Sequence, residues 1–106
     1  MKAAKRKRLE AAGWRVGDAR DFLGLSSSEL QFVEIKLALA KRLRELREEH
    51  HWTQAELAKK VGSSQSRVAK MEAGDPTVSV DLLVKSLLAA GADRHDLGRV
   101  VSARRR

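Results

Sequence analysis

Residues 53–74 run TQAELAKKVGSSQSRVAKMEAG, and this stretch decides the fold. Thr53 is followed three residues later by Glu56, a spacing that predicts a capping box and therefore the start of a helix. Gly62 predicts the end of that helix, because glycine readily adopts the left-handed conformation found at helix C-termini. The first half of the stretch is therefore expected to form one short helix.

A second short helix is expected directly after the turn. Either Ser63 or Ser64 is suited to cap it, since a serine hydroxyl accepts a hydrogen bond from the first free amides of a helix. The helix is expected to continue to about Ala73, where Gly74 supplies the stop. Two short helices joined by a turn of three or four residues form the helix-turn-helix layout.

That layout requires particular residue types at particular positions, and this stretch has them in register. A small residue is needed where the two helices cross, and Ala58 stands there. Gly62 supplies the turn with a residue that tolerates positive φ. The second helix has to bury one side against the first, and the apolar residues placed to do so are Leu57, Val61, Val68 and Met71.

A long helix is expected before this pair, from Ser26 to about His50. Ser26 and Glu29 form another capping box, and Leu25 and Leu30 are spaced as a hydrophobic staple. At 100° per residue, one apolar stripe contains Phe32, Ile35, Leu39, Leu43 and Leu46, and a second contains Leu30, Val33, Leu37 and Ala40. The first half of the helix is thus apolar on two sides, and we expect it to bury against the core and against the N-terminal leader or a second chain.

Two more helices are expected towards the C-terminus. Ser79 caps the first, which is rich in leucine and ends at Gly91, and the second starts after Asp93 with Leu97 to Val101 on its apolar side. No strand-like alternation of useful length is present. The predicted fold class is all-α.

Charge divides the 106 residues into three parts. Residues 1–24 form a basic leader with seven Lys and Arg against three acidic residues, and with one helical turn expected near residues 18–23. Residues 25–103 form the predicted helical domain, and residues 104–106 form a basic tail. Basic flanks suit contact with phosphate. There is no cysteine and no long apolar run, so we expect no disulfide, no membrane span and a cytoplasmic location.

The stretch from Thr53 to Gly74 closely resembles the XRE/Cro–phage repressor family, and the resemblance extends over about residues 37–90. It implies a five-helix lambda-repressor-like domain that binds double-stranded DNA, with the second helix of the motif in the major groove. Carried onto this chain, the resemblance implies that base edges are contacted by Ser64, Gln65, Ser66 and Lys70. It implies that Gln54 contacts phosphate or braces Gln65, and Arg67 is better placed for phosphate than for a base.

The resemblance also implies a buried ion pair between Arg47 and Glu72, tying the long helix to the recognition helix. A homodimer on a pseudo-palindromic operator is expected, through either the last helix or the second stripe of the long helix. As a small regulator with extra terminal segments, this chain resembles the HigA-type antitoxins. These antitoxins repress their own operon and neutralise a RelE/HigB-like toxin. The residues assigned to partner contact on this view are Trp14, Phe22, Leu30, Val33 and Leu37.

Two alternatives stay open beside the antitoxin: a stand-alone Cro-like repressor, and a protein-interaction adaptor that does not bind DNA. No arrangement of residues indicates a nucleophile with its base, a phosphate-binding glycine loop or a set of metal ligands. We therefore expect no enzyme activity, no cofactor and no metal. His50, His51 and His95 are expected at the surface or at caps, and Trp14 and Trp52 are expected to be packing anchors.

Overall fold

A computed structural model of the chain describes residues 26–103. The chain divides into two compact units, Met1–Ile35 with Arg104–Arg106, and Lys36–Ala103. The predicted turn near residues 18–23, the basic tail, and the assigned partner residues Trp14 and Phe22 lie outside the described residues. The division falls within the long helix, and the three-part organisation expected from charge stays a prediction.

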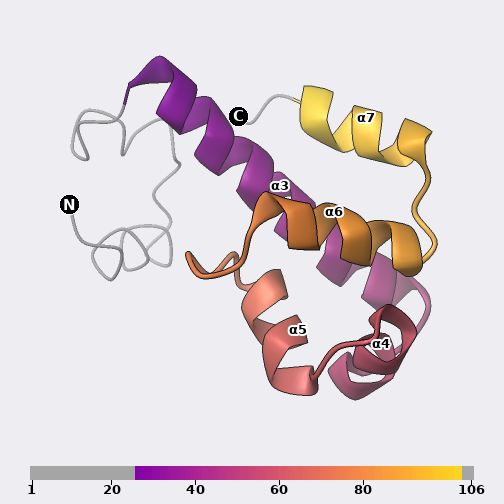
Figure 1. Ribbon diagram of the computed structural model, residues 1–106. Helices are drawn as coiled ribbons and strands as arrows, with labels where there is room; N and C mark the ends of the chain where they lie inside the picture. The colour runs from indigo at the N-terminus through magenta and orange to yellow at the C-terminus, as the bar shows by residue number, and fades with distance from the viewer. Residues whose placement is uncertain (1–25, 104–106) are drawn as a thin grey trace. The chain divides into compact units, whose positions relative to one another are not determined.

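The described residues form helices and no strand, as the all-α prediction requires. The helices are α3 (Ser27–Glu49), α4 (Gln54–Val61), α5 (Gln65–Glu72), α6 (Val80–Ala89) and α7 (Arg94–Ser102). Within the unit Lys36–Ala103, α4 packs against α5 and α6, and α7 turns back along α6 (Figure 1). None of the described helices is long and apolar enough to cross a membrane.

Side-chain caps start the helices where the sequence predicts. At Ser26 the hydroxyl accepts from the Glu29 amide at 3.2 Å, and the Glu29 carboxylate accepts from the Ser26 amide at 3.0 Å. The second of these bonds lowers the pKa of Glu29. Thr53 and Glu56 make the same reciprocal pair, and single hydroxyl or carboxylate caps begin α5, α6 and α7. Each cap satisfies a backbone amide that has no partner inside its own helix.

The hydrophobic core lies in the unit Lys36–Ala103. Its largest fully buried side chains are Leu39, Leu43, Leu57, Val68, Met71, Leu83 and Leu87. Leu39, Leu43 and Leu46 follow the predicted first stripe of α3, whereas Phe32 on the same stripe is 56% exposed. The expectation that Phe32 belongs to the buried stripe was therefore wrong. Phe32 precedes Lys36, so it is not part of the unit that contains the buried residues Leu39, Leu43 and Leu46.

The second stripe of α3 is buried at Leu30 (9% exposed) and Ala40 (2% exposed). Leu37 lies against Gly74, because a Cβ built on Gly74 would sit 2.8 Å from Cδ2 of Leu37. Gly74 has a φ of 66°, a left-handed conformation that residues with a side chain rarely adopt. Both this conformation and the close approach of Leu37 therefore favour glycine at position 74. Val33 is half-buried. Within this stripe Leu37 therefore has an intramolecular packing partner.

A charged network joins α3 to α7, and sequence reasoning did not find it. Arg42 donates from Nε to Asp96 at 3.1 Å and from Nη1 to Glu49 at 2.9 Å, and Arg99 binds the other Asp96 oxygen. The hydrogen bond to Glu49 raises the pKa of Arg42, with a smaller contribution from Asp96. Asp96 is 8% exposed, and this pairing satisfies its charge.

Candidate nucleic-acid interface

The two helices of the motif are α4 and α5, and the turn between them has the predicted geometry. Gly62 ends α4 with φ of 69° and ψ of 40°, the left-handed conformation. The Ser63 amide then donates to the Ala58 carbonyl at 2.8 Å. Ala58 is 4% exposed, which fits the small residue required at a helix crossing. Of the two serines suited to cap α5, it is Ser64 whose hydroxyl accepts from the Arg67 amide, at 3.2 Å.

One side of α5 is fully buried and the other is exposed. Val68 and Met71 are both 0% exposed, and Leu57 of α4 is also 0% exposed. The residues assigned to DNA are all exposed and lie on the other side of α5 or at its N-cap; they are Ser64, Gln65, Ser66, Arg67 and Lys70. Neither Arg67 nor Lys70 forms an ion pair with a described residue. Their charges are therefore available to an acidic partner.

A hollow of about 370 Å³ lies beside α5. It is lined by Ser64, Ser66, Arg67, Lys70, Thr77, Val78 and Leu82. Thr77 comes from the loop between α5 and α6, and sequence reasoning missed it. Its amide and its hydroxyl both donate to Oδ1 of Asp75, at 2.8 and 2.6 Å. The Asp-Pro-Thr sequence at residues 75–77, which follows α5 after Ala73 and Gly74, was a signal for such a turn.

The ion pair implied between Arg47 and Glu72 is present. Arg47 donates from Nε to Oε2 of Glu72 at 2.6 Å and from Nη2 to Oε1 at 3.1 Å, so the contact is bidentate. The side chains of Arg47 and Glu72 are 16% and 5% exposed. The hydrogen bond to Glu72 raises the pKa of Arg47, against the opposing effect of burial. The pair joins α3 to the last residue of α5.

Gln54 makes a contact within the domain that was not predicted. Its Nε2 donates to Oε1 of Glu72 at 3.2 Å, and no hydrogen bond joins it to Gln65. Gln54 is half-buried and is the first residue of α4. It therefore lies beside the ion pair, at a helix N-terminus whose free amides favour an anion.

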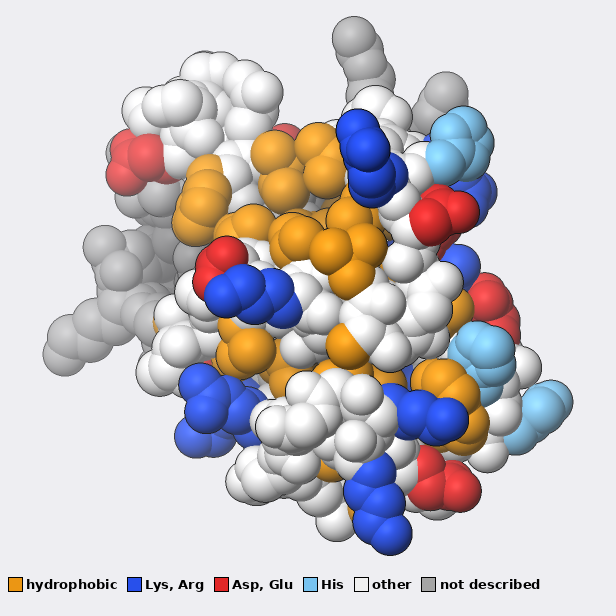
Figure 2. Space-filling model, turned by 45° about the vertical axis from the view of Figure 1, so that its right-hand side comes forward, with side chains coloured by type: hydrophobic (Ala, Val, Ile, Leu, Met, Phe, Trp, Pro, Cys, Tyr) orange, Lys and Arg blue, Asp and Glu red, His pale blue; other side chains and the backbone are white. Residues whose placement is uncertain are grey.

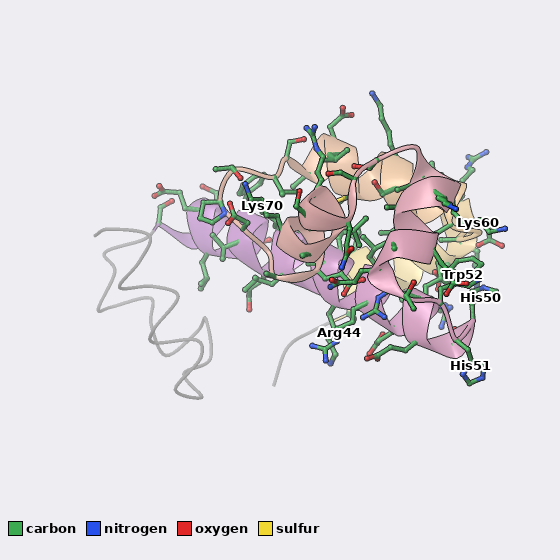
Figure 3. The ribbon with its side chains drawn as sticks, turned by 90° about the horizontal axis from the view of Figure 1, so that it is seen from below. Arg44, His50, His51, Trp52, Lys60 and Lys70 are labelled. Atoms are coloured by element: carbon green, nitrogen blue, oxygen red, sulfur yellow. The ribbon has the colours of Figure 1, made fainter. Side chains whose placement is uncertain are left out.

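Trp52, at the junction of α3 and α4, contacts one histidine and one lysine side chain. His50 stacks on it with ring centroids 4.3 Å apart, and Nζ of Lys60 lies 5.3 Å from its centroid. Figure 3 shows these three residues together at one end of the view, far from Lys70, while His51 and Arg44 point elsewhere. No cluster of metal-ligating residues occurs between residues 26 and 103. Trp52 was expected to be a packing anchor, and it is half-buried. Its stacking on His50 was not predicted.

Capped helices crossing at a small residue, with one helix exposing polar and cationic side chains, define a helix-turn-helix domain. The helix-turn-helix family model matches residues 43–87, which include all of α4 and α5. These residues are a helix-turn-helix domain of the XRE family, and the domain is that of a DNA-binding transcription regulator. No curated protein and no solved structure matches the chain.

Proposed function

We propose that this protein is a sequence-specific transcriptional repressor that binds a two-fold operator in the cytoplasm as a homodimer. The observation that carries the proposal is the division of α5 into a buried side and an exposed polar side. Val68 and Met71 hold the helix against the domain, and Gln65, Ser66 and Lys70 remain free to enter a major groove.

The exposed side chains suit different parts of DNA. A glutamine forms a bidentate pair with adenine, and a lysine donates to the acceptor edge of guanine. Gln65 and Lys70 are therefore proposed to specify sequence. Arg67 is proposed to bind a backbone phosphate, which positions the domain without selecting a base.

Lys70→Ala is expected to weaken binding to a selected operator by about ten- to a hundredfold, because a specific lysine contact is removed. The operator would be selected from a randomised duplex library, and binding would be measured at several salt concentrations. Replacement of a phosphate-binding cation lowers the salt slope by about 1, so Lys70→Ala and Arg67→Ala would separate base from phosphate contact.

The matched control is Lys85→Ala on α6, where Lys85 pairs with Asp81 at 3.2 Å and is 73% exposed. Its effect is expected to be less than about twofold, since an exposed ion pair contributes little. Affinity that is unchanged by Lys70→Ala and insensitive to salt would contradict DNA binding and favour the adaptor alternative.

The dimer surface is proposed on α6 and α7. Leu88 and Val101 are 45% and 47% exposed, and Figure 2 shows hydrophobic side chains gathered on one face of the molecule. The alternative surface, the second stripe of α3, is buried at Leu30 and Ala40. An isologous contact through α7 would pair two domains with the two-fold symmetry of such an operator, whose half-sites are spaced by about 10–10.5 base pairs.

Val101→Asp is expected to convert the dimer to a monomer, because a carboxylate in an apolar interface loses its hydration without gaining a partner. Sedimentation would show the change in mass, and operator binding would fall to that of a single half-site. Phe32→Asp is the matched control, since Phe32 is also a large exposed apolar residue, 56% exposed. Dissociation by Phe32→Asp, with Val101→Asp still dimeric, would place the dimer surface on the long helix instead.

A second candidate role is that of an autoregulating antitoxin with a RelE/HigB-like toxin as partner. The observation that favours it is Phe32, a large apolar side chain 56% exposed on the first half of α3. The test is co-expression of the tagged chain with its neighbouring genes, followed by native mass spectrometry. A stoichiometric small basic partner that arrests growth alone would support the antitoxin, and a bare homodimer would support the stand-alone Cro-like repressor.

A further inference from the structure

Glu72 has more hydrogen-bonding partners than a structural ion pair needs. Its Oε2 accepts from Arg47 at 2.6 Å, while its Oε1 accepts both from Arg47 at 3.1 Å and from Gln54 at 3.2 Å. The Glu72 side chain is 5% exposed, so water contributes little to these contacts. The carboxylate therefore binds Gln54, the first residue of α4, as well as Arg47 of α3.

The contact determines how the Gln54 amide is oriented. A carboxylate only accepts hydrogen bonds, so the nitrogen of the amide has to face Glu72 and the oxygen has to face away. The amide nitrogen has two hydrogens, and the bond to Glu72 uses one of them. No described residue accepts a hydrogen bond from the second hydrogen, and Gln54 is only half-buried, so this N–H can donate to an acceptor outside the domain.

The same ion pair also holds the backbone next to Gln54. Nη1 of Arg47 donates to the carbonyl oxygen of Trp52 at 3.0 Å, two residues before Gln54. Thr53 then caps α4 through its reciprocal bonds with Glu56. The start of α4 and the side chain of its first residue are thus both anchored to one buried pair.

We propose that Glu72 is a positioning residue for DNA binding, which holds Gln54 so that its free N–H donates to a phosphate of the DNA backbone. The proposal rests on the DNA-binding function proposed above. A glutamine side chain that is already ordered loses less conformational freedom when DNA arrives, so preorganisation contributes to affinity. The Arg47–Glu72 pair would then affect binding as well as folding.

The test compares Gln54→Ala in two backgrounds, wild type and Arg47→Met/Glu72→Met. Both charges are removed together because a lone buried charge threatens folding, whereas apolar replacement of a whole pair is often tolerated. The probe is a duplex of about 30 base pairs that contains the operator selected for the Lys70→Ala experiment, long enough for two half-sites spaced by about one turn. Circular dichroism would establish that each variant is folded at the temperature of the binding measurement.

In the wild type, Gln54→Ala is expected to weaken binding about tenfold, the effect of one hydrogen bond to a charged group. The slope of affinity against salt should not change, because glutamine carries no charge. In the Arg47→Met/Glu72→Met background, Gln54→Ala is expected to add less than about twofold, since Gln54 has already lost its anchor.

Arg44→Met/Glu48→Met is the matched control. This pair is also Arg–Glu on α3, but it is exposed, 62% and 53%, and the Arg44 Nε–Glu48 Oε2 contact is 3.3 Å. In this background Gln54→Ala should keep its full effect. Equal losses from Gln54→Ala in all three backgrounds would overturn the proposal, because Gln54 would then contact DNA without help from Glu72.

Lys70→Ala separates failure of this proposal from failure of the proposed function. If Lys70→Ala weakens binding and Gln54→Ala does not, the positioning role is refuted and the repressor function stands. If neither substitution has an effect, the DNA-binding surface itself has been wrongly assigned.

Discussion

Glu72→Ala is expected to lower the free energy of unfolding by about 3–5 kcal/mol, the usual effect of removing one member of a buried ion pair. Arg47 is 16% exposed and would keep its charge without the carboxylate that now binds two of its nitrogens. Gln54 would lose its acceptor at the same time. The measurement is urea or thermal unfolding, where about 4–8 °C of melting temperature corresponds to 1 kcal/mol in a small domain.

Glu48→Ala is the control for Glu72→Ala. Glu48 also pairs with an arginine, at 3.3 Å, but both side chains are more than half exposed. Such pairs contribute about 0–1 kcal/mol. Equal destabilisation by the two substitutions would show that the Arg47–Glu72 pair contributes no more than a surface pair does.

Met71→Ala is expected to destabilise the domain by about 2–5 kcal/mol, through lost burial and the cavity that remains. Met71 is 0% exposed, and its sulfur accepts from the Ser86 hydroxyl at 3.3 Å. The substitution therefore loosens the contact of the recognition helix with α6. Denaturant unfolding would measure the loss.

Met71→Leu tests whether volume is the cause. Leucine has nearly the same volume as methionine, and such exchanges usually cost less than about 1.5 kcal/mol. A loss as large as that of Met71→Ala would instead assign the effect to the Ser86–Met71 contact. Since both variants keep every side chain on the exposed side of α5, any change in DNA affinity would report on how firmly that helix is held.

The helices could be predicted because their signals are local. Ser26, Thr53 and Ser64 cap amides three residues ahead, so a pattern of four residues contains the whole interaction. The exposed side of α5 was also predictable, since helical periodicity places Val68 and Met71 on one side of the helix and Gln65, Ser66 and Lys70 on the other. The pairing of Arg47 with Glu72 required more than periodicity, and it came from the family resemblance.

Other features had no local signal. Arg42 and Asp96 are 54 residues apart, and many acidic residues could have been the partner of Arg42. Gln54 was expected to contact phosphate or to brace Gln65; it is not hydrogen-bonded to Gln65 and donates to Glu72, 18 residues away, while the phosphate contact stays a prediction. Phe32 satisfied the periodicity of the core stripe and is nevertheless exposed, because the periodicity of a helix does not say where its buried segment ends.

The sequence by itself determined which of the described segments are helical and where the turn between α4 and α5 lies, because caps, glycine turns and apolar periodicity act within about one turn of helix. The class of function followed from the family resemblance of that stretch. Only the tertiary structure decided which charges pair, which apolar residues stay exposed and where Thr77 lies. Those outcomes depend on the approach of segments that are distant along the chain. There, geometry selects one partner among several side chains of equal chemical suitability.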